Sequence, residues 1–200
     1  MRAPKAVVQY GSNWTLPNIL TIIRILMVPA FVGAFVLETY FLALLFFILA
    51  GVTDGLDGFL ARALKQRSRL GAFIDPLADK FLILSAFICL GVLGWIPLWL
   101  LILVISRDLV IISGFLTMRL SGIDVQQRIK ATPDSKLNTL TQILLVLILL
   151  SAQVFEADLL NAAGEVLIYL AGGFALFSGG HYVLLGFGLL SNSKREKGAG

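Results

Sequence analysis

Residues 40–61 read YFLALLFFILAGVTDGLDGFLA, an apolar run that ends in two carboxylates three positions apart, Asp54 and Asp57. The run is long enough to cross a bilayer as a helix, because a transmembrane helix needs about 20 mostly apolar residues. A carboxylate that faced lipid would be costly, so two of them near one end of such a helix indicate a functional group. The stretch therefore predicts a membrane helix with a polar site at one of its ends.

The rest of the chain repeats this apolar pattern. Hydrophobic residues make up 58% of the 200 residues and charged residues 14%, whereas water-soluble domains carry about a quarter charged residues. We predict an all-α integral membrane protein with six transmembrane helices in a single membrane-embedded domain over residues 1–190. Residues 191–200, SNSKREKGAG, are predicted to form a short disordered tail. The six predicted spans are 17–37, 40–61, 72–93, 96–118, 137–155 and 164–189.

The placement of Lys and Arg predicts the orientation of these helices. Of the 16 basic residues, all but Arg24, Lys80 and Arg107 lie before span 1, between spans 2 and 3, around the connection of spans 4 and 5, or after span 6. The alternate loops contain no basic residue and carry carboxylates such as Glu38. Because basic loops stay on the cytoplasmic side, we expect both termini in the cytoplasm. We also expect the protein to lie in a bacterial inner membrane.

Four carboxylates are predicted to meet at the cytoplasmic face. Asp54 and Asp57 lie in the last turns of span 2, and Asp75 and Asp79 lie in the first turns of span 3, in GAFIDPLADK. Spacings of three and four residues place each pair on one helix face, and a short loop joins the two antiparallel helices. The four negative charges of such a cluster would repel one another unless a cation neutralised them. Oxygen ligands select a hard ion such as Mg²⁺, Mn²⁺ or Ca²⁺, and two such ions can bridge a diphosphate.

Three other interpretations of the carboxylates compete with a catalytic metal site. Single acidic residues near a span end are often solvated interfacial groups, but four at matched spacing beside glycines are not typical of that. An ion or proton transporter would place carboxylates nearer the bilayer midplane with a path to both faces. Residues 41–49 and 82–91, the outer halves of spans 2 and 3, carry no polar relay. A structural membrane scaffold gives no reason for the four carboxylates, so the pattern favours an enzyme.

The spacing of these residues resembles the motif of the CDP-alcohol phosphotransferase family. That motif is Asp, two residues, Asp-Gly, two residues, Ala-Arg, about eight residues, Gly, three residues, Asp, three residues, Asp, and residues 54–79 match every spacing. The resemblance implies a six-helix membrane bundle, usually a homodimer, with its active site open to the cytoplasmic leaflet. It also implies an enzyme that displaces CMP from a CDP-linked donor with an alcohol acceptor.

The same resemblance assigns roles to individual residues of the motif. It makes Asp79 the general base that takes the proton of the acceptor hydroxyl. It implies two divalent cations, Mg²⁺ or Mn²⁺, held by four ligands: Asp54, Asp57, Asp75 and Asp79. The residues implied to line the CDP site are Gly58, Ala61, Arg62 and Gly71.

Shorter resemblances narrow the predicted substrates. LPNILTIIRI (16–25) resembles the first span of enzymes whose donor is CDP-diacylglycerol. ISRDLVI (105–111) and SKLNTLTQ (135–142) resemble the cardiolipin synthases of the family more than its phosphatidylglycerophosphate synthases. We therefore expect phosphatidylglycerol as the acceptor, with glycerol 3-phosphate as the alternative. The expected partners are these lipids and a second copy of the chain, with no nucleic acid.

Two arginines inside apolar spans, Arg24 and Arg107, have two possible roles. A guanidinium fork suits an acceptor phosphate, but each arginine could equally form an ion pair with Asp108 or with the acidic cluster. Lys136, at the start of span 5, is expected to contact the acceptor or to anchor the helix at the membrane surface. The single histidine, His181, is predicted to be an interior residue without a metal.

Overall fold

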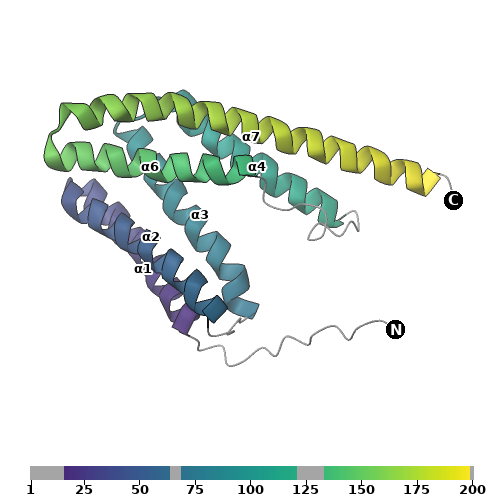
Figure 1. Ribbon diagram of the computed structural model, residues 1–200, viewed down its shortest axis with the longest axis horizontal. Coiled ribbons are helices and arrows are strands. Elements are labelled where there is room, and N and C mark those ends of the chain that lie inside the picture. The colour runs from purple at the N-terminus through teal and green to yellow at the C-terminus, as the bar shows by residue number, and fades with distance from the viewer. Residues whose placement is uncertain (1–15, 64–68, 121–132, 199–200) are drawn as a thin grey trace. The chain divides into compact units, whose positions relative to one another are not determined.

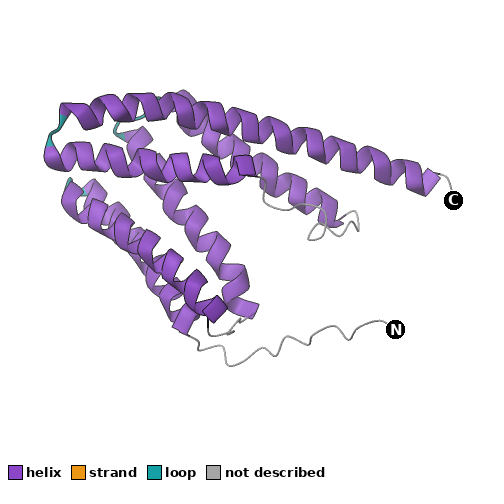
Figure 2. Cartoon of the chain, viewed as in Figure 1, coloured by secondary structure: helices purple, strands orange, loops and turns teal. Residues whose placement is uncertain are grey.

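The computed structural model describes residues 16–63, 69–120 and 133–198. Every regular element within these ranges is an α-helix, as Figure 2 shows. The helices are α1 (Leu16–Val36), α2 (Tyr40–Ala63), α3 (Arg69–Val92), α4 (Leu98–Leu120), α6 (Pro133–Phe155) and α7 (Asp158–Gly198). The prediction of an all-α protein is thus confirmed over the described residues.

The helices follow the predicted spans closely except at the start of α6 and at both ends of α7. Helix α6 begins at Pro133 rather than at 137, because proline is well tolerated in a first turn, where its missing N–H needs no partner. Helix α7 begins at Asp158, with a carboxylate in its first turn, and extends to Gly198. Residues 191–198, predicted as disordered tail, are therefore helical. They contain no proline, and no glycine before Gly198, and Lys, Arg and Glu favour the helix.

The chain divides into two compact units, Met1–Cys89 and Leu90–Gly200. In the first unit α1 packs along α2, and the two helices lie side by side in Figure 1. Phe31 of α1 lies between Phe35 and Phe47, with ring centroids 5.8 Å from each. Ala43 and Ala50 are fully buried on α2, where their small side chains allow the helices to approach. That residues 1–190 form a single domain stays a prediction.

In the second unit α7 packs against both α4 and α6 (Figure 1). Glycines on α7 allow close contact with each neighbour. A Cβ built on Gly164 would lie 2.7 Å from Leu149 of α6, and one built on Gly172 would lie 2.6 Å from Trp99 of α4. The packing of this unit therefore depends on two glycines that face different partners.

Two of the helix ends share the same backbone geometry. At the end of α1 the N–H of Thr39 donates to the carbonyl of Ala34 and that of Glu38 to Phe35, with φ of Glu38 at +57°. Residues after α3 repeat the pattern, with Gly94 at φ +73°. Both ends are Schellman motifs, in which one residue adopts a left-handed conformation and the last carbonyls of the helix are satisfied.

Two helical segments of the described residues are long and apolar enough to cross a membrane, Asp134–Phe155 and Asp158–Leu184. Shorter apolar segments are Ile22–Val36, Tyr40–Leu56 and Lys80–Val92. Many large apolar side chains on these helices are exposed, including Val36, Phe41 and Leu159. Exposed apolar surface on long helices favours a membrane protein. Six spans and cytoplasmic termini stay predictions.

Candidate functional site

The predicted acidic cluster lies on the second half of α2 and the first half of α3. The helix bounds place Asp54, Asp57, Gly58, Ala61 and Arg62 within α2, and Gly71, Asp75 and Asp79 within α3. Helical geometry therefore keeps each pair of aspartates on one face of its helix. Of all these residues only Asp54 has a described side chain. The side chains of residues 57–79 lie outside the described part of the chain.

Asp54 is held by an arginine from the neighbouring helix. Nη1 of Arg24, on α1, lies 2.9 Å from Oδ1 of Asp54, on α2. The Arg24 side chain is fully buried, whereas the Asp54 side chain is 48% exposed. An arginine is buried in a protein interior only when its charge is compensated. The ion pair with the acidic cluster, one of the two roles considered for Arg24, is thus present in the structure.

The surroundings of Asp54 fit a hard divalent cation. Its carboxylate supplies oxygen atoms, it remains half-exposed beside Arg24, and Asp57 follows one turn later on the same helix face. Among the described side chains, no three or more His, Cys, Asp or Glu residues lie close enough together to hold a metal ion. These described side chains include only one of the four predicted ligands, Asp54. The donor type therefore agrees with Mg²⁺ or Mn²⁺, and the full ligand set stays a prediction.

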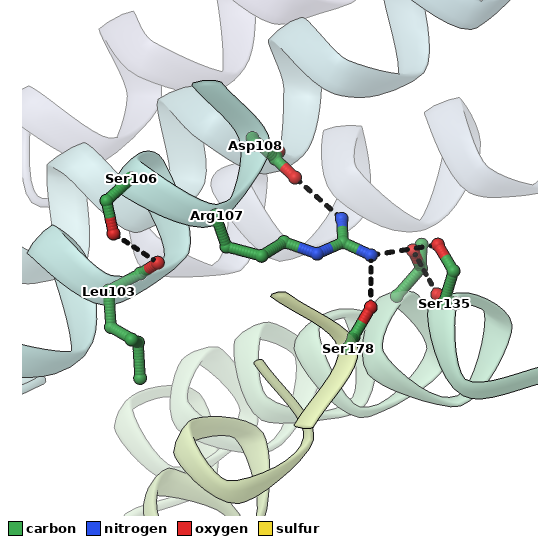
Figure 3. Close-up of polar contacts among 7 residues, drawn as sticks. Leu103, Ser106, Arg107, Asp108, Ser135 and Ser178 are labelled. Carbon is green, nitrogen blue, oxygen red and sulfur yellow. Dashed lines mark hydrogen bonds and ion pairs between the residues drawn. The ribbon is translucent and has the colours of Figure 1, made fainter. Parts of the chain in front are cut away.

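A second polar centre surrounds Arg107 in the other unit, where α4, α6 and α7 each contribute a residue (Figure 3). Nη1 of Arg107 donates to Oδ1 of its neighbour Asp108 at 2.7 Å. Nη2 donates to Ser135 Oγ on α6 and to Ser178 Oγ on α7, each at 2.8 Å. The ring of Tyr182 lies 6.0 Å from the guanidinium carbon. Arg107 thus joins three helices through its charge and its donors.

Several buried polar atoms of this unit make no hydrogen bond to the described residues. Nε of Arg107 has no partner within the described part of the chain. Neither amide atom of Asn138 has one, nor does Nε2 of Gln142. Asn138 is fully buried, and Gln142 is almost so. Buried polar groups in native proteins normally find a partner in the protein or in ordered water, so these atoms have hydrogen-bonding capacity that the described side chains do not use.

The remaining predicted residues of this unit lie around the start of α6. Lys136 is exposed there, next to Ser135. Nδ1 of His181 on α7 lies 2.6 Å from Oδ2 of Asp134 on α6. His181 is therefore a partly exposed residue that links two helices, rather than the interior histidine that the sequence suggested.

Sequence reasoning did not identify Ser135, Ser178, Asn138 or Gln142 as members of a polar centre. A signal was present for α6, because Ser135, Asn138 and Gln142 recur at spacings of three and four residues and therefore share one helix face. Ser178 had no such signal, since it stands alone among small and apolar residues of α7.

A sequence model of the CDP-alcohol phosphatidyltransferase family matches residues 14–177. This match includes the whole acidic motif and Arg24, Arg107 and Asn138.

Curated relatives carry two different activities in their names. Human cardiolipin synthase (CMP-forming) is 38% identical over an alignment of 161 residues, which covers 74% of this chain and 54% of the human protein. The rat cardiolipin synthase is 39% identical over 76% of this chain and 55% of its own length. CDP-diacylglycerol–glycerol-3-phosphate 3-phosphatidyltransferase of Blochmanniella floridana is 36% identical over 71% of this chain and 76% of its own length. The chain thus spans about half the length of the human and rat relatives.

Proposed function

Because the chain belongs to the CDP-alcohol phosphatidyltransferase family, we propose that it transfers the phosphatidyl group of CDP-diacylglycerol to a glycerol hydroxyl and releases CMP. The observation that carries this proposal is the complete acidic motif at residues 54–79, inside the matched region and on two successive helices. Such a motif gives no support to the alternative of an ion or proton transporter.

The proposed reaction is a displacement at the phosphorus atom of the donor next to the diacylglycerol. The acceptor oxygen forms a new bond to this phosphorus as the bond to the CMP oxygen breaks. Asp79 takes the proton that the acceptor hydroxyl loses, and CMP leaves with the electron pair of the broken bond. A base must lie within hydrogen-bond reach of that hydroxyl, so in this proposal the acceptor would lie beside the first half of α3.

In this proposal the carboxylates hold two divalent cations. Asp54, Asp57, Asp75 and Asp79 would be the ligands, and the bound ions would neutralise the diphosphate and lower the pKa of the acceptor hydroxyl. Arg24 keeps the carboxylate of Asp54 in place through its 2.9 Å ion pair. Gly58, Ala61 and Gly71 would leave room for the CDP group, and Arg62 would bind its phosphate oxygens.

For the acceptor we propose phosphatidylglycerol, which makes the product cardiolipin. The human and rat relatives, which are named cardiolipin synthases, support this choice. The exposed Lys136 would then contact the acceptor at the membrane surface.

Purified protein in mixed micelles with CDP-diacylglycerol and Mg²⁺ or Mn²⁺ tests the proposal. Each acceptor is supplied separately, and CMP release is followed together with the lipid product. We expect CMP and cardiolipin with phosphatidylglycerol, and loss of both when the metal is removed with EDTA. Absence of CMP with every acceptor would refute the enzyme proposal. Activity with glycerol 3-phosphate alone would instead establish the alternative acceptor.

The proposed base has its own test. Asp79→Asn should lower turnover on the order of 100-fold or more, because an amide cannot accept the proton. Asp158→Asn, at the start of α7, changes a carboxylate outside the motif and serves as the matched control. We also propose that the enzyme acts as a homodimer in a bacterial inner membrane, with its active site facing the cytoplasm.

A further inference from the structure

The packing of α1 on α2 brings Arg24 to the first aspartate of the acidic motif. Phe31 of α1 lies against Phe47 of α2, and Arg24 lies against Asp54. Arg24 precedes Phe31 by seven residues, and Asp54 follows Phe47 by seven. Seven residues make about two turns of an α-helix, so both pairs fit one antiparallel register of the two helices. The aromatic packing and the ion pair are therefore parts of the same contact between α1 and α2.

Arg24 is the buried member of the ion pair. Its side chain is fully buried, although Ile22, Ile23 and Ile25 beside it in the sequence are exposed. The guanidinium thus lies on the face of α1 that packs against α2, in a stretch that is otherwise apolar. A charged side chain in such a stretch is costly and is usually retained for a function.

Asp54 is the open member of the pair. Its side chain is 48% exposed. A Cβ built on Gly51 or on Gly55 would meet no described atom within 4 Å, so there is space beside the carboxylate. The hydroxyl of Thr53 donates to a carbonyl of its own helix. A carboxylate in such an open position could adopt several rotamers, and the contact of Oδ1 with Arg24 restricts it to one.

A guanidinium beside a metal ligand has two opposite effects on cation binding. Its positive charge repels the cation, whereas its hydrogen bond holds the ligand in one orientation. Water around the half-exposed Asp54 weakens the repulsion. The orienting effect persists, because Arg24 is buried and held by the packing of α1 on α2. We therefore expect the orienting effect to be the larger of the two.

We propose that Arg24 is a positioning residue, which holds Asp54 in the orientation that binds a divalent cation and so sets the affinity of the acidic motif for that cation. This inference rests on the proposed transferase function, in which Asp54 is a metal ligand. It assigns Arg24 to the metal site and not to the phosphate of the acceptor, the other role considered for it.

The first experiment measures cation binding without turnover. Purified protein in detergent, with no lipid substrate, is titrated with Mn²⁺, and the free ion is followed by electron paramagnetic resonance. Arg24→Met should raise the Kd for Mn²⁺ about tenfold or more, the usual effect of removing a group that orients a metal ligand. Arg24→Lys, which keeps the charge but not the planar fork, should fall between the wild-type protein and Arg24→Met. A Kd that is unchanged or lower in Arg24→Met would overturn the proposal, as would a wild-type protein that binds no Mn²⁺.

A matched control separates this role from a general weakening of the helix contact. Phe31→Leu removes aromatic packing from the same contact, two turns from Arg24. We expect it to lower Tm and to keep the wild-type Kd for Mn²⁺. If Phe31→Leu raises the Kd as much as Arg24→Met does, any loosening of α1 against α2 weakens the site and the proposal fails. Should Arg24→Met not fold, Arg24→Gln permits the same comparison, because its shorter side chain also loses the contact with Asp54.

Turnover measurements separate the metal role from an acceptor role. In Arg24→Met the Mn²⁺ concentration for half-maximal CMP release should rise by the same factor as the Kd. At saturating Mn²⁺ the KM for phosphatidylglycerol should equal that of the wild-type protein. A raised KM with a wild-type Kd for Mn²⁺ would assign Arg24 to the acceptor and overturn the proposal.

The same measurements keep the two proposals apart. If the wild-type protein releases no CMP with any acceptor, the proposed function fails, whatever its Kd for Mn²⁺. If it releases CMP and Arg24→Met has the wild-type Kd for Mn²⁺, only the present inference fails.

Discussion

At the scale of single residues, the ion pair of Arg24 and Asp54 joins α1 to the proposed metal site. Its two members differ in environment, since Arg24 is fully buried and Asp54 is half-exposed. A carboxylate near water can be solvated when its partner is removed, whereas a buried guanidinium has little access to water. The pair therefore couples a buried charge on α1 to a half-exposed carboxylate on α2.

We predict that Asp54→Ala and Arg24→Met each lower the free energy of unfolding by on the order of 1–3 kcal/mol, because each removes one charge of the pair. The double variant should be less destabilised than the sum of the single variants, because both remove the same interaction. Thermal unfolding in detergent measures each variant. Thr53→Val is the control, since the Thr53 hydroxyl donates to the carbonyl of Ala50 within its own helix. Additive effects of the two single substitutions would contradict the predicted coupling.

At the scale of helices, the ends of α1 and α3 allow a direct comparison. Both are Schellman motifs, but the left-handed position is Glu38 after α1 and Gly94 after α3. A side chain in this conformation costs about 1 kcal/mol or more, and glycine avoids that cost. Thus Glu38→Gly should raise Tm, and Gly94→Ala should lower it. Glu165→Gly, in the interior of α7, should be destabilising, and a stabilising effect there would show that the gain at Glu38 has another cause.

Packing of α7 on α4 gives a second prediction at this scale. A Cβ on Gly172 would meet the Trp99 ring at 2.6 Å, whereas one on the adjacent Gly173 meets nothing within 4 Å. Both glycines lie inside the same helix, so alanine should gain similar helix propensity at each, about 1 kcal/mol. We expect Gly173→Ala to stabilise the protein and Gly172→Ala to be less stable than Gly173→Ala. Equal unfolding temperatures would mean that Trp99 moves aside without cost.

At the scale of the whole molecule, the distribution of basic residues predicts which connections face the cytoplasm. The turns after α1 and α6 should lie outside and the end of α7 inside. Because Cys89 is the one cysteine of the sequence, Cys89→Ala provides a background for single cysteines at other positions. In spheroplasts, Leu37→Cys and Leu159→Cys should react with an impermeant maleimide, and both side chains are exposed. Ser193→Cys should react only after permeabilisation. Labelling of Ser193→Cys in spheroplasts before permeabilisation would contradict the predicted orientation.

Much of the fold and of the proposed catalytic motif could be predicted from local patterns. Apolar runs and turn residues located the helices within a few residues, because each helix needs enough apolar length and each connection needs a break. The predicted bounds of the last helix, 164–189, were too narrow, because its glycines and its charged end suggested a shorter helix than α7, which extends from Asp158 to Gly198. The acidic motif was readable because its four carboxylates occur at helical spacing on two successive segments.

The sequence by itself determined the all-helical class, the membrane character and the spacing of the four aspartates, because these depend on composition and on the fixed period of the α-helix. Tertiary structure decided which groups on other helices contact the two buried arginines. Arg24 pairs with Asp54 on the next helix, and Arg107 reaches Ser135 and Ser178, 28 and 71 positions away along the chain. Such pairings depend on how each helix is rotated against its neighbours. That rotation is set by the packing of many side chains at once and not by the residues that form the pair.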